Sequence, residues 1–407
     1  MAAAKVALFG LFGSGNLGNG GSLEAMVAFL RSRHPNTELA VVCAGPEEVQ
    51  RELGVPAFSM TWYRPADEPR AKAVVRKAVG KVVDAVRTFR WVRRFDVVVV
   101  PGTGILETTL PIRPWGFPYA LLLVSVCGKL SGTKVAYVSV GADSTTQPAT
   151  RWVMKTATTL ADYRSYRDEL SRDAMRGMGV DTSRDRVYPD LAFALPVPRA
   201  ENAATKTVGV GVMAYYGTYV DRRQADDIYS TYVEKLTTFV RWLVDEGYRV
   251  RFFTGDPADE SVASAVTSDL RRTRPELADT RLVTDFAPTL SGLIEQMAAV
   301  DVVVASRFHN VLSALKLAKP TISISYASKN DKLMDGMGLG EFCQPIRSLD
   351  VARLIEQFCA LAATRERLTS EIFETNERNL KLLDQQFVVL SETLFSADRV
   401  TAAAGSD

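Results

Sequence analysis

The stretch "DVVVASRFHNVLSALKLAKPTISISYASKND", residues 301–331, decides the fold class. It opens with a run of apolar residues, continues as a segment with helical spacing, and ends in a second run rich in β-branched residues. A strand, a helix and a strand in this order form a βαβ unit, whose two strands are parallel. Neither run contains an internal charge, which is typical of strands that are buried on both faces. We therefore expect a parallel sheet with helices on both sides.

The same alternation recurs on both sides of segment 196–206, "PVPRAENAATK", whose composition is typical of a linker. Strands are expected at 5–12, 38–44, 96–102, 134–141, 207–215, 248–255, 302–306 and 320–327. Helices are expected between them, among others at about 21–33, 71–94 and 151–175. We therefore expect two Rossmann-like doubly wound α/β domains facing a cleft. The expected bounds are 1–195 and 207–348 for the domains, 349–398 for C-terminal helices and 399–407 for a flexible tail.

The composition is that of a folded protein with more than one domain: 407 residues, of which 47% are hydrophobic and 24% charged. A formal net charge of +2 gives no reason to expect nucleic acid as a partner. The four cysteines lack the spacing of metal ligands, so we expect free thiols and no metal site. The start does not have the pattern of a signal peptide, and no apolar run reaches the ~20 residues that span a bilayer. We therefore expect a cytoplasmic protein.

An arginine and a histidine follow the strand at 302–306. Arg307 and His309 lie where a helix is expected to begin, and Ser306 or a neighbour is expected to cap that helix. Helix N-termini attract anions, arginine binds carboxylates and phosphates through a planar fork, and histidine exchanges protons near neutral pH. The next strand ends in "SYASKND", so Lys329 is expected at the adjacent strand end. Three such groups would converge on one anionic ligand; the alternative is a core histidine beside two solvated cations.

A glycine-rich loop, "GSGNLG" at 13–18, follows the first strand and has the spacing of a dinucleotide-binding loop. The strand at 38–44 ends without the acidic residue that would hold a ribose in such a site. Three interpretations stay open: a dinucleotide site, a tight turn with a backbone role, and a loop that offers Asn16 and Asn19 to a polar ligand. Asparagine amides both donate and accept hydrogen bonds, which suits sugar hydroxyls.

A second glycine loop, "PGTGILE" at 101–107, follows the strand at 96–102. Its glycines allow a ligand to approach the backbone closely, and Thr103 offers a hydroxyl group. The alternative is a turn that leads into the cap of a short helix. Thr103 is therefore a candidate binding residue.

Several of these stretches together resemble the polysaccharide pyruvyltransferase family. The most specific match is 301–339, with an arginine-x-histidine motif, the strand after it and a lysine three residues past Tyr326. The loops at 13–25 and 101–107 resemble two further motifs of that family, although they differ in detail from its most typical members. "YRSYRDELS" (163–171) resembles an Arg-Asp-x-x-Ser signature, and "YPDLAF" (188–193) resembles the motif that contains Asp190. The resemblance spans about residues 5–345.

This resemblance implies a fold like the GT-B glycosyltransferase architecture. It also implies transfer of pyruvate from phosphoenolpyruvate to two hydroxyls of one sugar, which forms a cyclic ketal, releases phosphate and needs no cofactor. On this basis His309 and Arg307 are expected to be catalytic, as general acid and anion clamp. Ser306 and Lys329 are expected to bind the donor, and Asn16, Asn19 and Thr103 the acceptor. The general base is not identified; Asp143, Asp168 and Asp190 lie near strand ends and have either this role or a structural one.

Two other functions stay open at this point. One is a GT-B-type glycosyltransferase that uses a nucleotide sugar, for which Asp331 and Asp335 are candidate ribose ligands. The other is a non-catalytic sugar-binding relative that has kept the fold.

Residues 70–94, "RAKAVVRKAVGKVVDAVRTFRWVRR", contain nine Arg or Lys and one Asp. Val75, Val79, Val82, Val86 and Phe89 recur at helical spacing and form an apolar stripe. One interpretation is a stripe that faces the core, with a solvated basic face behind it. The other is peripheral contact with anionic lipid at the inner leaflet of a membrane, which would suit a lipid-linked or glycolipid acceptor.

Overall fold

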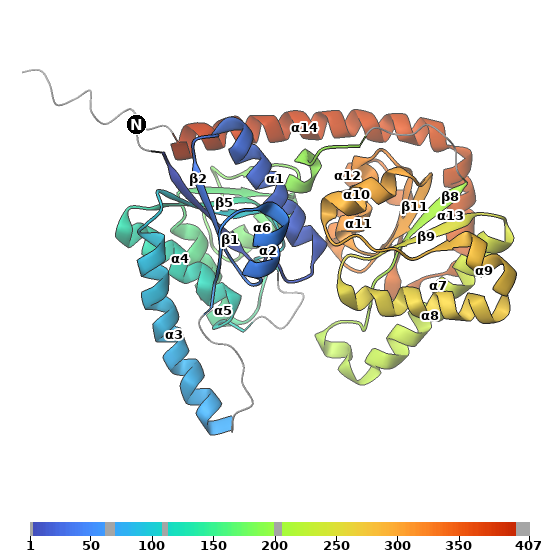
Figure 1. The fold of residues 1–407 in the computed structure, drawn as a ribbon, viewed down its shortest axis with the longest axis horizontal. Helices are drawn as coiled ribbons and strands as arrows, with labels where there is room; N and C mark the ends of the chain where they lie inside the picture. Colours follow the sequence, from blue (N-terminus) through green and yellow to red (C-terminus); the bar gives the residue numbers. More distant parts are fainter. Residues whose placement is uncertain (1–2, 62–69, 108–112, 199–205, 396–407) are drawn as a thin grey trace, which may run out of the picture. The chain divides into compact units, whose positions relative to one another are not determined.

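The computed structural model describes residues 3–61, 70–107, 113–198 and 206–395 (Figure 1). The chain forms two compact units. Unit 1 consists of Met1–Ser14, Ser22–Leu191 and Lys381–Asp407, and unit 2 of Gly15–Gly21 and Ala192–Leu380. Among the described residues, no helix is long and apolar enough to cross a membrane.

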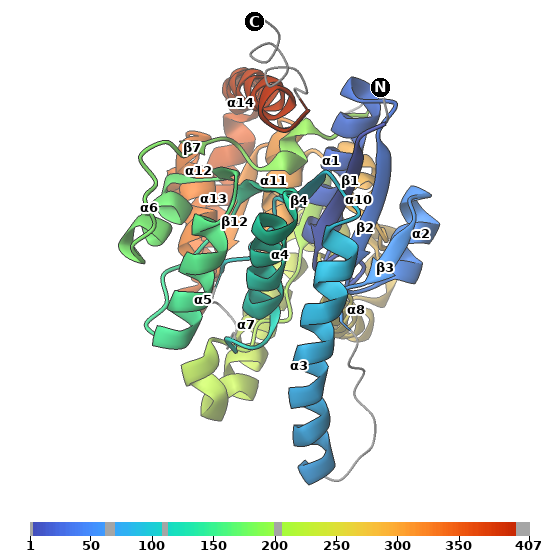
Figure 2. The ribbon, with the colours of Figure 1, turned by 90° about the vertical axis from the view of Figure 1, so that its left-hand side faces the viewer.

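Unit 1 is built on a parallel sheet of seven strands. In spatial order these are β3 (Ala57–Ser59), β2 (Glu38–Cys43), β1 (Lys5–Gly10), β4 (Val97–Pro101), β5 (Lys134–Val140), β6 (Tyr163–Tyr166) and β7 (Arg186–Val187). The helices are α1 (Leu17–Arg33), α2 (Pro46–Leu53), α3 (Arg70–Val92), α4 (Phe117–Ser131), α5 (Pro148–Thr159) and α6 (Glu169–Gly177), followed by the 3-10 turn η1 (Leu191–Ala194). Figure 2 shows α3, α4 and α5 side by side along one face of this sheet.

The central strands of unit 1 are buried along most of their length, as their apolar sequence predicts. Every residue of β4 is buried, and Phe9 of β1 stacks between Trp91 and Phe117 at ring distances of 5.9 and 6.0 Å. The strand order reverses direction between β1 and β4. In doubly wound sheets, ligands bind outside the carboxyl ends of the strands at such a point. Both glycine loops of the first half follow these two strands.

Unit 2 contains a parallel sheet of six strands. In spatial order these are β10 (Leu282–Val283), β9 (Arg249–Phe253), β8 (Thr207–Gly211), β11 (Val302–Ala305), β12 (Thr321–Ser325) and β13 (Cys343–Pro345). The helices are η2 (Tyr219–Gln224), α7 (Ala225–Asp245), η3 (Pro257–Asp259), α8 (Glu260–Thr273), α9 (Pro275–Arg281), α10 (Leu290–Ala298), α11 (Phe308–Lys316), α12 (Ser328–Gly336), η4 (Gly340–Phe342), η5 (Ile346–Ser348) and α13 (Val351–Ala363). The reversal here lies between β8 and β11.

The structure differs from the sequence prediction at several elements. Helix α1 begins at Leu17 rather than near residue 21, so "LGNGG" is its first turn instead of a loop. Strand β6, "YRSY", divides the region predicted as helix over 151–175, because four residues are too few to show an alternating pattern. The short strands β3 and β13 were not predicted for the same reason.

The last helix does not form a separate C-terminal segment. Helix α14 (Arg365–Phe395) contributes to both units, and its residues from Lys381 onward belong to unit 1. There Gln386 is fully buried and bonds the hydroxyls of Ser139 and Ser165, while Lys134 donates to the carbonyl of Thr393 at 2.8 Å. Most of the predicted linker and all of the predicted tail lie outside the described residues.

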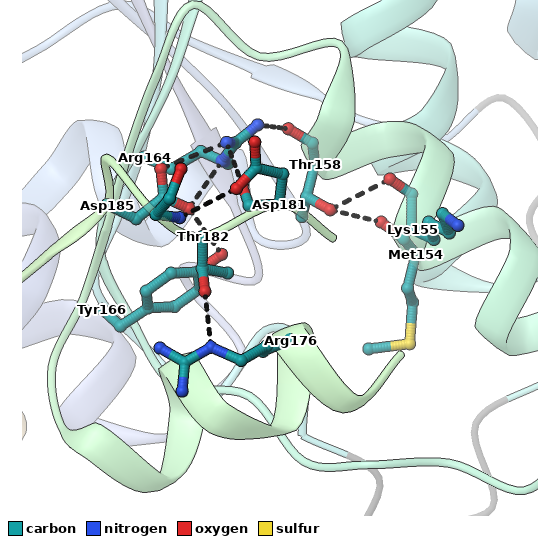
Figure 3. Close-up of polar contacts among 10 residues, drawn as sticks. Met154, Lys155, Thr158, Arg164, Tyr166, Arg176, Asp181, Thr182 and Asp185 are labelled. Atoms are coloured by element: carbon teal, nitrogen blue, oxygen red, sulfur yellow. Dashed lines mark hydrogen bonds and ion pairs between the residues drawn. The ribbon is translucent and has the colours of Figure 1, made fainter. Parts of the chain in front are cut away.

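Arg164 on β6 acts as a clamp at the edge of the unit 1 sheet, where its guanidinium bonds three neighbouring segments (Figure 3). Its Nε and Nη2 donate to the Asp185 carboxylate at 2.9 and 3.1 Å, and Nη1 donates to the carbonyl of Thr158 at 2.9 Å. Asp185 also accepts a hydrogen bond from the Tyr166 hydroxyl at 3.3 Å. Burial, and then the Asp185 charge, raise the pKa of Tyr166, so it stays a neutral donor. One guanidinium thereby joins β6, the end of α5 and the segment before β7.

Replacing Arg164 tests this clamp. Arg164→Ala leaves the buried Asp185 carboxylate without its counter-charge, and we expect a loss of about 3 kcal/mol in the free energy of unfolding. Denaturant unfolding followed by circular dichroism measures it. The control is Arg33→Ala, which removes an exposed ion pair of unit 1 (3.7 Å) and should cost about 0.5 kcal/mol or less. Equal losses in the two variants would contradict a structural role for the clamp.

Candidate functional site

The predicted arginine–histidine motif lies where β11 ends and α11 begins in unit 2. Arg307 is the N-cap residue of α11, with extended backbone, and no side chain caps this helix. The first N–H groups of such a helix have no intrahelical acceptor, so they favour an anion. Ser306, predicted as a cap or a donor ligand, is instead fully buried, and its hydroxyl bonds the Tyr232 hydroxyl at 2.9 Å. Its carbonyl accepts from Asn330 at 3.0 Å, so its contacts support the end of β11.

Arg307 is held by a carboxylate that the sequence reasoning missed. Its Nε and Nη2 donate to Asp259 at 2.8 and 2.6 Å. Asp259 is fully buried and also accepts the N–H groups of Ala214 and Gly255, at 2.9 and 3.1 Å. Burial lowers the pKa of the guanidinium, but the hydrogen bonds and charge of Asp259 outweigh it and raise that pKa. Arg307 therefore keeps its charge, and its Nη1 group has no hydrogen bond to a described residue.

His309 lies one helical position past Phe308, and its imidazole stands edge-on to the Phe308 ring at 5.1 Å. The first turn of α1 also lies close to the imidazole. A Cβ atom placed on Gly18 would lie 1.9 Å from His309 Nδ1, so only glycine fits there. The backbone N–H of Leu17 also donates to the carbonyl of Gly255 at 3.0 Å. The glycine loop of the first half is therefore part of the surroundings of His309.

Lys329 is the second residue of α12 and lies close to the same motif. Its Nζ is 5.3 Å from the ring centre of Tyr326 and 5.7 Å from that of Phe308. Phe308 stands between Arg307 and His309 in the chain, so the lysine lies beside the motif. The structure thus brings together the three residues that the sequence placed at neighbouring strand ends.

The two asparagines of the glycine loop belong to the start of α1. Asn16 precedes the helix, and its side-chain oxygen accepts the N–H of Asn19 at 3.3 Å. Asn16 is therefore an N-cap that still has its amide NH₂ group for other contacts. Asn19 lies in the first turn, on the same short segment as Gly18. Whether either asparagine binds an acceptor stays a prediction.

The start of the glycine loop interlocks with the end of β2 in unit 1. A Cβ on Gly13 would lie 2.2 Å from the carbonyl oxygen of Gly45, and one on Gly45 would lie 1.8 Å from that of Gly13. Gly45 also donates its N–H to Phe12 at 3.0 Å. The backbone of the loop itself thus fills the position where a dinucleotide site would carry its acidic residue. Of the three interpretations left open for this loop, this geometry favours a backbone role.

Thr103 lies in the second glycine loop with a backbone φ of 62°, which is unusual for a residue with a side chain. It is almost fully buried, and its hydroxyl has no hydrogen-bond partner among the described residues. Such strain persists only where the surroundings enforce it. Whether Thr103 contacts a ligand stays a prediction.

The motifs of unit 1 meet at one buried guanidinium. Arg167, with 2% of its side chain exposed, contacts the carboxylates of Glu107, Asp190 and Asp168, the last two at 3.3 and 3.6 Å. Asp168 caps α6 through the N–H of Ser171 at 2.7 Å, and the Ser171 hydroxyl accepts the N–H of Ala142 at 3.0 Å. Two of the three predicted base candidates thus have structural partners here. No group of three His, Cys, Asp or Glu in the described ranges could hold a metal ion.

A double-mutant cycle tests the pair that orients Arg307. We expect Asp259→Asn and Arg307→Gln each to destabilise the protein by about 3 kcal/mol, because each leaves the opposite charge, fully buried for Asp259 and 20% exposed for Arg307, without its partner. The double variant should lose at least 1 kcal/mol less stability than the sum of the two single losses, because directly coupled residues are not additive. Thermal unfolding of the four proteins gives these values. The exposed pair Lys332–Asp335, at 3.9 Å, is the control. In its double-mutant cycle, the stability losses of the two single substitutions should add up in the double variant.

Comparison with known proteins identifies a family and a fold. A family model described as polysaccharide pyruvyl transferase matches residues 16–328. No curated protein matches the chain significantly. Solved structures with a similar fold include a UDP-N-acetylglucosamine 2-epimerase (TM-score 0.64, 11% identity, 98% of each chain covered). Others are the Neisseria meningitidis UDP-GlcNAc 2-epimerase bound to UDP-GlcNAc (TM-score 0.61, 10% identity, 97% of this chain and 100% of that chain) and the apo form of a lipopolysaccharide outer core galactosyltransferase (TM-score 0.52, 13% identity, 96% and 99%).

At these identities the structural similarity shows the fold alone. The two parallel sheets with interleaved helices, and the likeness to these solved structures, confirm the prediction of a two-domain Rossmann-like α/β fold of the GT-B type.

Proposed function

Because the chain belongs to the polysaccharide pyruvyl transferase family, we propose that it moves pyruvate from phosphoenolpyruvate to two hydroxyls of a sugar. The products are a cyclic ketal and inorganic phosphate. The observation that carries the proposal is the grouping of Arg307, His309 and Lys329 at the ends of β11 and β12. Together with the uncapped N-terminus of α11, these groups suit a small ligand that has both a carboxylate and a phosphate.

In the proposed reaction, protonation of the donor comes first. His309 gives a proton to the methylene carbon of phosphoenolpyruvate, and the adjacent carbon becomes electrophilic. One sugar hydroxyl adds to that carbon, and its proton returns the imidazole to its starting state. The second hydroxyl then displaces phosphate, which takes up the second hydroxyl proton, and the ketal ring closes. The methyl group of the product thus carries the proton that the histidine supplied.

The anionic groups of the donor need fixed cations. The Asp259 carboxylate occupies one edge of the Arg307 guanidinium, so the Nη1 group is the part directed to a ligand. A fork held on one edge presents its other donors in a fixed direction, which favours a pre-organised anion site. Lys329, steadied by two aromatic rings, would neutralise the second anionic group. Leaving-group charge would thus be stabilised by groups that need no rearrangement.

Replacement of His309 tests the acid role. His309→Asn should lower phosphate release from phosphoenolpyruvate plus acceptor by about a hundredfold or more, because it removes the proton donor. The chain offers a matched control in its other histidine, His34, which bonds Ser391 at 2.9 Å in unit 1. The His34→Asn variant should release phosphate at the same rate as the unaltered protein. Full turnover in folded His309→Asn would rule out the proposed acid.

A ligand screen separates this function from its rivals. Phosphoenolpyruvate at a hundred times its Kd should stabilise the protein by about 2.7 kcal/mol, seen as a rise in Tm. Arg307→Lys should lose this rise, since lysine cannot bond Asp259 and a ligand with one planar fork. Stabilisation by a nucleotide sugar alone would instead favour a glycosyltransferase. Binding of phosphoenolpyruvate without phosphate release from any acceptor would favour a non-catalytic relative.

A further inference from the structure

Helix α3 presents its apolar stripe to solvent. The side chains of Val79, Val82, Val86 and Phe89 are 51%, 66%, 48% and 37% exposed. The side chain of the fifth member, Val75, lies outside the described part. The interpretation that this stripe faces the core is therefore wrong for the four described residues. Contiguous exposed apolar side chains at helical spacing mark a surface that binds another protein, a ligand or a membrane.

The opposite side of the helix packs on unit 1. Gly80, Asp84, Thr88 and Val92 are buried, and they recur at intervals of four residues. Up to Thr88 the inward residues are thus small or polar, whereas the valine–phenylalanine stripe points outward; only at the C-terminal end of α3 do Trp91 and Val92 pack on the core. Figure 2 shows the N-terminal half of α3 running past the end of the neighbouring α4.

The exposed surface is strongly basic. Segment 70–94 has nine Arg or Lys residues and one acid, Asp84, which lies on the buried face. Arg76, Arg87 and Arg90 are exposed and border the apolar stripe. The chain as a whole carries only +2, so segment 70–94 concentrates positive charge that the rest of the sequence balances. Apolar residues flanked by arginine are the pattern of helices that lie in a membrane interface.

A cavity of about 520 Å³ lies beside the same helix. Lys77 and Lys81 of α3 and Arg113 before α4 line it, together with Trp115 and Asp84. Trp115 is 61% exposed. This volume is in the range of small-ligand sites, and tryptophan beside basic residues is typical of the level of lipid head groups.

We propose that α3, with Arg113 and Trp115, docks on a bilayer that contains anionic lipids. The valine–phenylalanine stripe enters the interface, and the arginines and lysines meet the head-group phosphates. A second copy of the chain is a poorer partner, because two basic faces would repel each other. Docking would place the enzyme next to sugars carried on lipid, although the inference rests on this surface alone and does not depend on pyruvyl transfer.

Vesicle sedimentation tests the proposal with the full chain and no substrate. The protein should pellet with mixed phosphatidylcholine–phosphatidylglycerol vesicles at low salt, less at high salt, and hardly with phosphatidylcholine alone. Arg87→Gln with Arg90→Gln should lower the partition coefficient by roughly 25-fold, at about fivefold for each arginine near the surface. Val82→Ser with Val86→Ser should lower it by about tenfold through lost apolar burial.

Matched controls remove the same side chains elsewhere. Arg271→Gln with Arg272→Gln on α8, and Val220→Ser at a residue 87% exposed, should leave vesicle binding unchanged. All variants change exposed residues, so their unfolding temperatures should match that of the parent. Absence of binding to anionic vesicles at low salt, or equal binding by the α3 variants, would overturn the proposal. So would a concentration-dependent dimer that only the α3 variants abolish, since the surface would then be a protein interface.

Discussion

The arginine–histidine motif of unit 2 depends on one buried carboxylate. Asp259 has no exposed surface, so its charge must be compensated by hydrogen bonds and a counter-charge. Arg307 supplies the charge, and the backbone N–H groups of Ala214 and Gly255 supply the remaining bonds. These partners come from the segments after β8, β9 and β11. A single acid thus fixes three strand ends relative to one another, together with the start of α11.

Much of this site was predictable, because parallel strands end at one edge of a sheet. Arg307 and Lys329 follow neighbouring strands in the sequence, and that was sufficient to place them together. Asp259 was not predictable, since it is one of three acids in "GDPADE" (255–260) and only the tertiary structure decides which one is buried. The contact of Gly18 with His309 joins distant parts of the chain, and no local pattern indicates such a contact.

Helix α3 shows a different limit of sequence analysis. Its periodicity correctly grouped the valines on one side, but a period does not say whether that side meets the core or the solvent. Which side faces the core is decided by Gly80, Asp84 and Thr88, whose small or polar side chains pack inward.

The family motifs of unit 1 also show their role only in the tertiary structure. They are scattered in sequence and become intelligible once Arg167 is seen to bind carboxylates from three of them.

The interlock of Gly13 and Gly45 has an evolutionary consequence. In most packed cores, an enlarged side chain can be accommodated by a second substitution that makes its neighbour smaller. Here each partner is already the smallest residue, and each would collide with the other's main chain rather than with a side chain. No compensating substitution exists within the pair, so relatives that keep this backbone path must keep both glycines. A relative that has lost one of them must have moved the loop itself, and with it the start of α1.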